Sequence, residues 1–236
     1  MNQTVHAPIL DPRLSTALAF VRPNAVVADV GTDHAYLPAA LVLQGKISRA
    51  FAADINAGPL AKAAETVDKY QLREHIDLCL TDGLHGLEGR GITDILIFGM
   101  GGELIAKILL EAPFVRDSSV RLILQPMTKQ AELRRWLAQE GFSIVDERLS
   151  LAAGKIYQTI CTEWHGSGDL MTPLELELGP RILKQRPPEL LPLVSHKIDV
   201  LRSRITGQRC VGEANEEDQQ MLSAMESLLN ELTERR

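Results

Sequence analysis

Four apolar runs in the first half of the chain each end close to an acidic residue or a glycine, and segments of helical periodicity separate them. The runs cover residues 26–30, 49–55, 76–80 and 94–98. Apolar runs that alternate with amphipathic helices predict parallel strands joined by crossover helices. Because the carboxyl ends of parallel strands share one edge of a sheet, we expect the acidic residues and glycines to gather there.

The rest of the first two thirds completes an α/β pattern. We expect a further strand at 121–124 and helices at 14–20, 34–43, 59–70, 103–110 and 129–139. Two later runs, 142–149 and 156–162, have only Ala152-Ala153-Gly154-Lys155 as a turn between them, which predicts an antiparallel hairpin. A mostly parallel sheet that closes with such a hairpin is typical of the Rossmann-like class I methyltransferases, whereas a nicotinamide dehydrogenase usually continues parallel.

A helical tail is expected to follow the α/β region. The segment His165-Gly166-Ser167-Gly168 predicts a domain boundary, with a cofactor-binding domain over residues 1–165 and a helical domain over 166–236. In the tail we expect one helix at 187–206, a turn at 207–213 and a second helix at 216–234. Each helix carries an apolar stripe, so the two are predicted to form an antiparallel coiled-coil hairpin.

Charge is distributed unevenly along this tail, although the net charge of the whole chain is −6. The segment 181–209 holds seven basic residues and two acids, and the segment from Val211 onward holds seven acids and two arginines. The basic residues are Arg181, Lys184, Arg186, Lys197, Arg202, Arg204 and Arg209. Two interpretations stay open: a helical hairpin that pairs with itself, or a phosphate-binding face set against a solubilising one.

Composition narrows the class of protein. No apolar run approaches the roughly 20 residues that span a bilayer, and residues 1–10 lack the pattern of a secretory signal. Three cysteines, at positions 79, 161 and 210, are too few and too scattered for a disulfide framework or a zinc site. We therefore expect a cytoplasmic protein with reduced thiols, no bound metal and no membrane association.

The residues at the predicted strand ends indicate a nucleoside-containing cofactor. Gly31 would let a ligand approach bare backbone at a helix start, Asp29 could accept from a cofactor amine, and Asp54 suits the hydroxyls of a ribose. Each residue also has a structural explanation. Asp33 could cap the next helix, Asp54 could form an Asx turn, and the glycines at 101 and 102 could permit close packing. The first turn lacks the Gly-x-Gly-x-x-Gly spacing, so a methyltransferase is favoured over a dehydrogenase.

The segment Ala28-Asp29-Val30-Gly31-Thr32-Asp33-His34-Ala35-Tyr36-Leu37-Pro38 resembles the first motif of the bacterial tRNA (adenine-22-N1)-methyltransferases, the TrmK family. Further motifs follow in the family order over nearly the full length: Asp82-Gly83-Leu84, Gly99-Met100-Gly101-Gly102, Leu122-Ile123-Leu124-Gln125-Pro126 and Gly154-Lys155-x-Tyr157. Two positions depart from the family. Thr32 replaces a serine, and Met127 stands where an asparagine follows the Gln-Pro pair.

The resemblance implies S-adenosyl-L-methionine as cofactor and methylation of N1 of adenine 22 in the D-loop of tRNA. The implied cofactor-binding residues are Asp29, Gly31, Thr32, Asp33, His34, Asp54, Ile55, Asp82 and Gly83. The implied acceptor pocket lies near Gly99, Met100, Gly101, Gly102, Gln125 and Tyr157, with no catalytic group assigned. Arg134 and Arg135 are expected to bind tRNA phosphates together with the basic residues of the tail. A methyltransferase of another substrate, or a non-catalytic RNA-binding protein, remains as an alternative.

Overall fold

A computed structural model describes residues 7–210 and 216–234 of the chain. The chain divides into two compact units, the first ending at Asp169 and the second starting at Leu170. This division lies just beyond the glycine-containing segment where a domain boundary was expected. Each unit is described by itself below.

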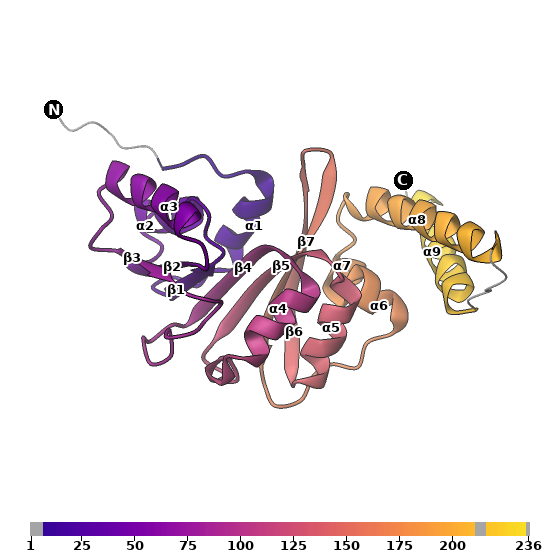
Figure 1. Ribbon diagram of the computed structural model, residues 1–236. Helices are drawn as coiled ribbons and strands as arrows, with labels where there is room; N and C mark the ends of the chain where they lie inside the picture. The colour runs from indigo at the N-terminus through magenta and orange to yellow at the C-terminus, as the bar shows by residue number, and fades with distance from the viewer. Residues whose placement is uncertain (1–6, 211–215, 235–236) are drawn as a thin grey trace. The chain divides into compact units, whose positions relative to one another are not determined.

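The first unit is built on one seven-stranded sheet (Figure 1). Its strands are β1 (Val26–Val30), β2 (Arg49–Asp54), β3 (Ile76–Leu80), β4 (Asp94–Gly101), β5 (Arg121–Thr128), β6 (Phe142–Ala152) and β7 (Lys155–Trp164). The order across the sheet is β3-β2-β1-β4-β5-β7-β6, with β7 antiparallel to both β5 and β6. The predicted mostly parallel sheet with a closing hairpin is therefore confirmed. The order changes direction between β1 and β4, which is where ligands bind in open α/β sheets.

Helices cover both faces of this sheet. They are α1 (Pro12–Phe20), α2 (Tyr36–Leu43), α3 (Ala57–Lys69), α4 (Gly102–Leu110) and α5 (Gln130–Gln139), with a short 3-10 helix, η1 (Pro113–Val115). Figure 1 shows α1, α2 and α3 on one side of the sheet and α4 and α5 on the other. Because both faces are covered, the central strands are buried and almost continuously apolar, as in Ile95, Leu96 and Ile97 of β4.

Four strands, β4 to β7, are longer than predicted, and the extra residues of β4 and β5 lie at the carboxyl edge of the sheet. β4 continues to Gly101 and β5 to Thr128 because Met100 pairs with Pro126 and Gly101 with Thr128. The register shifts on both sides of Met100, so β4 carries a bulge at this point. Bulges of this kind bend a strand and redirect its side chains, and they are common beside active sites.

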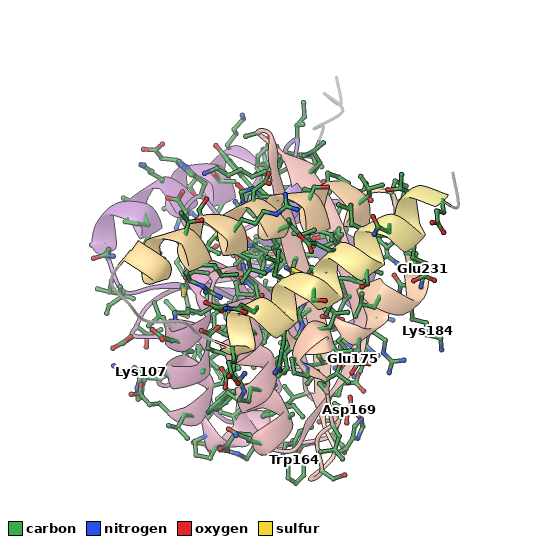
Figure 2. The ribbon with its side chains drawn as sticks, turned by 90° about the vertical axis from the view of Figure 1, so that its right-hand side faces the viewer. Lys107, Trp164, Asp169, Glu175, Lys184 and Glu231 are labelled. Atoms are coloured by element: carbon green, nitrogen blue, oxygen red, sulfur yellow. The ribbon has the colours of Figure 1, made fainter. Side chains whose placement is uncertain are left out.

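The second unit consists of α6 (Pro173–Leu178), α7 (Pro180–Gln185), α8 (Leu190–Cys210) and α9 (Glu216–Glu234). α8 and α9 pack against each other (Figure 2). They run antiparallel, since Arg186 of the segment before α8 pairs with Glu231 and Arg202 pairs with Glu226. The apolar stripe of α8 and part of that of α9 are buried: Leu190, Leu193, Val194, Ile198, Leu201, Ile205, Met225 and Leu228. Among the described helices, none is both long and apolar enough to cross a bilayer.

The turn predicted at 207–213 is wrong over its first part, because α8 continues through Gly207 to Cys210. A glycine inside a helix costs about 1 kcal/mol, and burial of the neighbouring Ile205 offsets that cost. Residues 211–213 of the predicted turn lie outside the described part of the chain.

Candidate functional site

Asp29 is a buried carboxylate at the carboxyl end of β1. Its side chain is only 5% exposed, and its Oδ2 accepts a 2.6 Å hydrogen bond from the hydroxyl of Thr32. Burial raises the pKa of Asp29 to about 6; the Thr32 hydrogen bond opposes this rise and the charge of Asp54 adds to it. Ionising this carboxyl group costs free energy when no ligand is bound. It is therefore a strong candidate for contact with a cationic or hydrogen-bond-donating ligand.

Gly31 forms the turn that follows β1, and its backbone lies close to β2 and β4. The amides of Gly31 and Thr32 both donate to the carbonyl of Ala53, at 2.8 and 3.1 Å. Gly31 has a φ of +74°, and a Cβ at this position would collide with the Cε methyl of Met100. The end of a flexible side chain occupies the space where that Cβ would lie, and Gly31 is partly exposed, so its backbone is accessible to a ligand.

The residues after this turn are held in left-handed conformations instead of starting a helix. Asp33 and Ala35 have φ of +47° and +53°, and α2 begins only at Tyr36 with Ala35 as its N-cap and no side-chain capping bond. The interpretation of Asp33 as a helix cap is therefore wrong. Its exposed carboxylate lies 3.5 Å from Nε2 of His34, whose ring stacks on Tyr36. Strained backbone of this kind concentrates at ligand sites.

Asp54 at the end of β2 fits both interpretations that the sequence left open. Its Oδ1 accepts from the amide of Asn56 at 2.8 Å, which is the Asx turn. Its Oδ2 has no hydrogen-bond partner among residues 7–210 and 216–234 and remains available to a ligand. Asp82, exposed in the turn after β3, lies one strand further along the same edge.

Large apolar side chains stay exposed after the carboxyl ends of these strands. They include Tyr36, Ile55, Leu80, Leu104 and Met127, each at least 40% exposed. Apolar side chains exposed beside the acidic residues of this edge suit the apolar parts of a ligand. Of these residues, the sequence predicts only Ile55 as a binding residue, because hydrophobic periodicity does not distinguish an exposed leucine from a buried one.

The predicted acceptor pocket lies where β4 and β5 end. Gly102 is required for packing, since a Cβ there would collide with the carbonyl oxygen of Lys129. Gln125 is fully buried, and its Oε1 accepts a 3.1 Å hydrogen bond from Nη1 of Arg13. The guanidinium of Arg13 also lies 5.8 Å from the ring centroid of Tyr157. Arg13 was absent from the predicted site, because no motif in the sequence links the first helix to β5.

The prediction that Arg134 binds RNA is wrong. Its side chain is fully buried, pairs with the equally buried Glu147 at 2.7 Å and donates to Gln158 at 2.6 Å. Helix α5 places Arg134 on its inner face, whereas its neighbour Arg135 is exposed. Two adjacent arginines on a helix point about 100° apart, and the sequence did not show which of them faced the sheet.

The basic residues of the tail are largely paired within the second unit. Lys197 lies 2.6 Å from Glu177, Arg202 lies 2.7 Å from Glu226, and Arg204 contacts Asp218. The self-pairing hairpin, one of the two interpretations, is thus observed. Lys184 is exposed, as are more than half of the Arg202 and Arg204 side chains, and the side chain of Arg209 lies outside the described part.

Metal and thiol chemistry are not indicated within the described residues. No group of three or more His, Cys, Asp or Glu side chains there could hold a metal ion. Cys161 is buried in β7, and burial raises the pKa of its thiol to about 12. Burial likewise raises the pKa of the half-buried Cys79.

The strand order and the acidic side chains at the ends of β1 and β2 define a class I methyltransferase, and a family described as "Methyltransferase domain" matches residues 10–160. The tRNA (adenine(22)-N(1))-methyltransferase of Bacillus subtilis is 39% identical over 154 residues, which are 65% of this chain and 65% of that relative. The structure of B. subtilis TrmK, the m1A22 tRNA methyltransferase, matches with 32% identity and a TM-score of 0.77 over 96% of this chain and 98% of that one. Streptococcus pneumoniae Sp1610 in complex with S-adenosyl-L-methionine matches with 32% identity and a TM-score of 0.84 over 94% and 100%. The chain belongs to the TrmK family of tRNA (adenine-22-N1)-methyltransferases.

Proposed function

We propose that this protein transfers a methyl group from S-adenosyl-L-methionine to N1 of adenine 22 in the D-loop of tRNA, in the cytoplasm. The observation that carries the proposal is the pair of carboxylates, Asp29 and Asp54, on either side of the partly exposed Gly31 turn. Asp29 lies beside the switch point between β1 and β4, and Asp54 lies on the adjacent strand β2 at the same edge of the sheet. The B. subtilis relatives of this chain are tRNA (adenine-22-N1)-methyltransferases.

The residues at this edge fit the chemistry of the cofactor. When bound, S-adenosyl-L-methionine supplies a methyl group on a positively charged sulfonium. The unpartnered Oδ2 of Asp54 suits a ribose hydroxyl, and the exposed Ile55 and Leu80 suit the faces of a purine, with Asp82 and Gly83 at its border. The carboxylates of Asp29 and Asp33 complement the positive charges of the methionine end.

The reaction requires little acid–base chemistry from the protein. N1 of neutral adenine carries an in-plane lone pair, so it needs no base to become a nucleophile. The protein must align that lone pair with the methyl group and exclude water, which is an effect of orientation. Because N1 lies on the pairing edge, the base must also leave any stack or pair, at a cost of about a few kcal/mol. The segment from Gly99 to Gly102 and the nearby Tyr157 are proposed to hold the base.

We also propose that basic residues hold the tRNA phosphates, and that α8 and α9 form a coiled-coil hairpin that presents some of them. The exposed candidates are Arg135, Lys184, Arg202 and Arg204, and the partly exposed ones are Arg181, Arg186 and Lys197. Arg209 is a further candidate from the sequence, and its side chain lies outside the described part. The ion pairs along α8 and α9 support a rigid hairpin, and the partial exposure of Arg202 and Arg204 leaves guanidinium groups that can reach phosphates.

One assay tests the proposal. The protein is incubated with S-adenosyl-L-methionine labelled in its methyl group and with unmodified tRNA, and the labelled nucleoside is identified and located in the sequence. We expect 1-methyladenosine at position 22 and no label in a tRNA that carries guanosine there. Label at another position, or in a small molecule or protein, would instead support a methyltransferase of another substrate. Absence of saturable cofactor binding in calorimetry would favour a non-catalytic protein.

A further inference from the structure

We propose that Arg13 is an RNA-binding residue of the acceptor pocket and that its guanidinium binds a phosphate next to the target nucleotide. This inference rests on the proposed function and deepens it. None of the motifs at the strand ends includes Arg13, which lies in the first turn of α1.

Three elements of the sheet hold the guanidinium of Arg13 at the carboxyl edge. Its Nη1 donates to Oε1 of Gln125 on β5. Gln125 is the residue of β5 that pairs with Phe98 of β4. A Cβ at Gly99 would lie 3.4 Å from the same Nη1, so the bulge of β4 brings its backbone close to the guanidinium. The ring of Tyr157 on β7 lies 5.8 Å away. Arg13 therefore stands among the residues predicted to form the acceptor pocket.

α1 is itself anchored, so the position of Arg13 is well defined. Asp11 caps the helix by accepting from the amide of Leu14 at 2.8 Å. The hydroxyl of Thr16 lies 2.9 Å from that of Thr159 on β7, which ties the helix to the closing hairpin. A cation held in this way loses little conformational entropy when it binds a ligand.

Gln125 serves to position Arg13 and does not contact the substrate in this arrangement. It is completely buried, and its Nε2 donates to the carbonyl of Pro126 at 3.2 Å. Arg13, in contrast, keeps 24% of its side chain exposed. A guanidinium has five N–H donors, and only Nη1 is engaged with Gln125, so further donors can turn to a ligand.

The charge of Arg13 is balanced differently from that of four other buried or partly buried arginines in this unit. Those arginines each pair with a carboxylate at 2.6 to 2.7 Å: Arg22 with Asp94, Arg116 with Glu140, Arg121 with Glu163 and Arg134 with Glu147. Arg13 instead contacts the neutral amide of Gln125 and the ring of Tyr157. Its ion pair with the half-exposed Asp11 is longer, at 3.6 Å. Its positive charge is therefore available to an anion that enters the pocket.

Phosphate is the anion that the reaction brings there. The sulfonium of the cofactor and the product 1-methyladenine are positively charged, so a guanidinium repels both. The other anion of the reaction is the methionine carboxylate of the cofactor, and the measured cofactor affinity of each variant distinguishes it from a phosphate. A nucleotide that leaves the stack carries its own phosphate to the mouth of the pocket. Arginine binds phosphate oxygens in a bidentate, charge-assisted manner, which fixes both position and orientation.

The test compares the variants Arg13→Ala, Arg13→Lys and Gln125→Met with the unaltered protein. Arg49→Ala serves as the matched control, because it removes one exposed arginine at the amino end of β2, on the opposite edge of the sheet. We expect Arg13→Ala to raise the KM for tRNA roughly 10- to 100-fold, because the variant loses a charged hydrogen-bond donor to the phosphate. The dependence of log affinity on log salt should become shallower by about one. Arg13→Lys should recover part of the affinity, and Gln125→Met should lower it less than Arg13→Ala.

The affinity for S-adenosyl-L-methionine and the melting temperature are measured for every variant. An unchanged KM for tRNA and an unchanged salt slope in Arg13→Ala would overturn the inference, as would a loss confined to cofactor binding. If Arg13→Ala does not fold, the KM for tRNA of Gln125→Met is read in its place, and an unchanged KM in that variant overturns the inference. If the unaltered protein methylates no tRNA, the proposed function fails. The salt slope of tRNA binding, measured by fluorescence anisotropy without the reaction, then still decides the role of Arg13.

Discussion

The hydroxyl of Thr32 donates a 2.6 Å hydrogen bond to the buried carboxylate of Asp29, and this bond joins the end of β1 to the turn that follows it. Thr32 stands where the resemblance to the TrmK family leads us to expect a serine. The hydroxyl group makes the contact, and both residue types supply it. The same bond stabilises the ionised form of Asp29 against the burial that opposes it.

Asp29 is expected to make the stability of the unliganded protein depend on pH. The folded protein holds this proton up to a pKa of about 6, well above the ordinary 3.8, whereas the unfolded chain releases it near the ordinary value. The free energy of unfolding therefore falls as pH rises from about 4 to about 6 and is flat above that. Asp29→Asn should be more stable than the unaltered protein at pH 7.5, by up to about 3 kcal/mol, and equal to it near pH 4. Urea unfolding at both pH values measures this; an equal difference at the two values contradicts it.

Asp54 is expected to bind the cofactor through its charge. Asp54→Ala should weaken the binding of S-adenosyl-L-methionine by one to two orders of magnitude, since hydrogen bonds to a charged group contribute about 1.5–3 kcal/mol each. Asp54→Asn is the matched control for the fold, because its side-chain oxygen can still accept from the amide of Asn56. Isothermal calorimetry should show weakened binding in both variants. An unchanged dissociation constant in Asp54→Ala would show that the ribose lies elsewhere.

Two glycines of the site should respond in opposite ways to alanine. Gly102→Ala places a Cβ against the backbone carbonyl of Lys129, which cannot move alone, so the melting temperature should fall strongly. Gly31→Ala displaces only the Cε methyl of Met100 and adds backbone strain of about 1 kcal/mol. That variant should stay folded and lose cofactor affinity. Thermal unfolding with and without S-adenosyl-L-methionine separates the two effects, and equal loss of stability in both variants would refute the distinction.

Arg134 is expected to matter for stability and not for RNA. Arg134→Met leaves Glu147 buried without its ion-pair partner, which should cost about 3–5 kcal/mol of unfolding free energy. Arg135→Met, on the exposed side of the same helix, should change stability by less than about 0.5 kcal/mol. The double variant Arg134→Met, Glu147→Leu should recover most of the loss. Denaturant unfolding checks all three, and a double variant no more stable than Arg134→Met would argue against the pair as the cause.

The tail can be tested with variants that break the same ion pair from either side. Arg202→Gln removes a cation and Glu226→Gln removes its partner, so both lose the 2.7 Å contact. If Arg202 binds tRNA phosphates, only Arg202→Gln should raise the KM for tRNA and flatten its salt dependence. Filter binding over a range of salt concentrations measures both effects. Equal behaviour of the two variants would mean that the pair serves only to hold α8 and α9 together.

The local sequence pattern predicted the fold because the apolar runs, the helical periodicity and the turn residues all indicated the same architecture. The apolar runs identified β1 and β3 to the residue, and the absence of room for a helix between β6 and β7 predicted the hairpin. The acidic residues at strand ends could be placed at one edge because parallel strands with crossover helices must align their carboxyl ends. The extensions of β4 and β5 escaped prediction, since glycine and proline rarely lie within strands and only their mutual pairing keeps them there.

By itself, the sequence determined the sheet, the carboxylates at its edge and the family, because these depend on the order of residues along short segments. Only the tertiary structure decided which of two adjacent arginines is buried, since that depends on how α5 turns toward Glu147. It also decided the place of Arg13, which meets Gln125 across 112 positions of the chain. Contacts between such distant residues arise from packing, and no local periodicity records them.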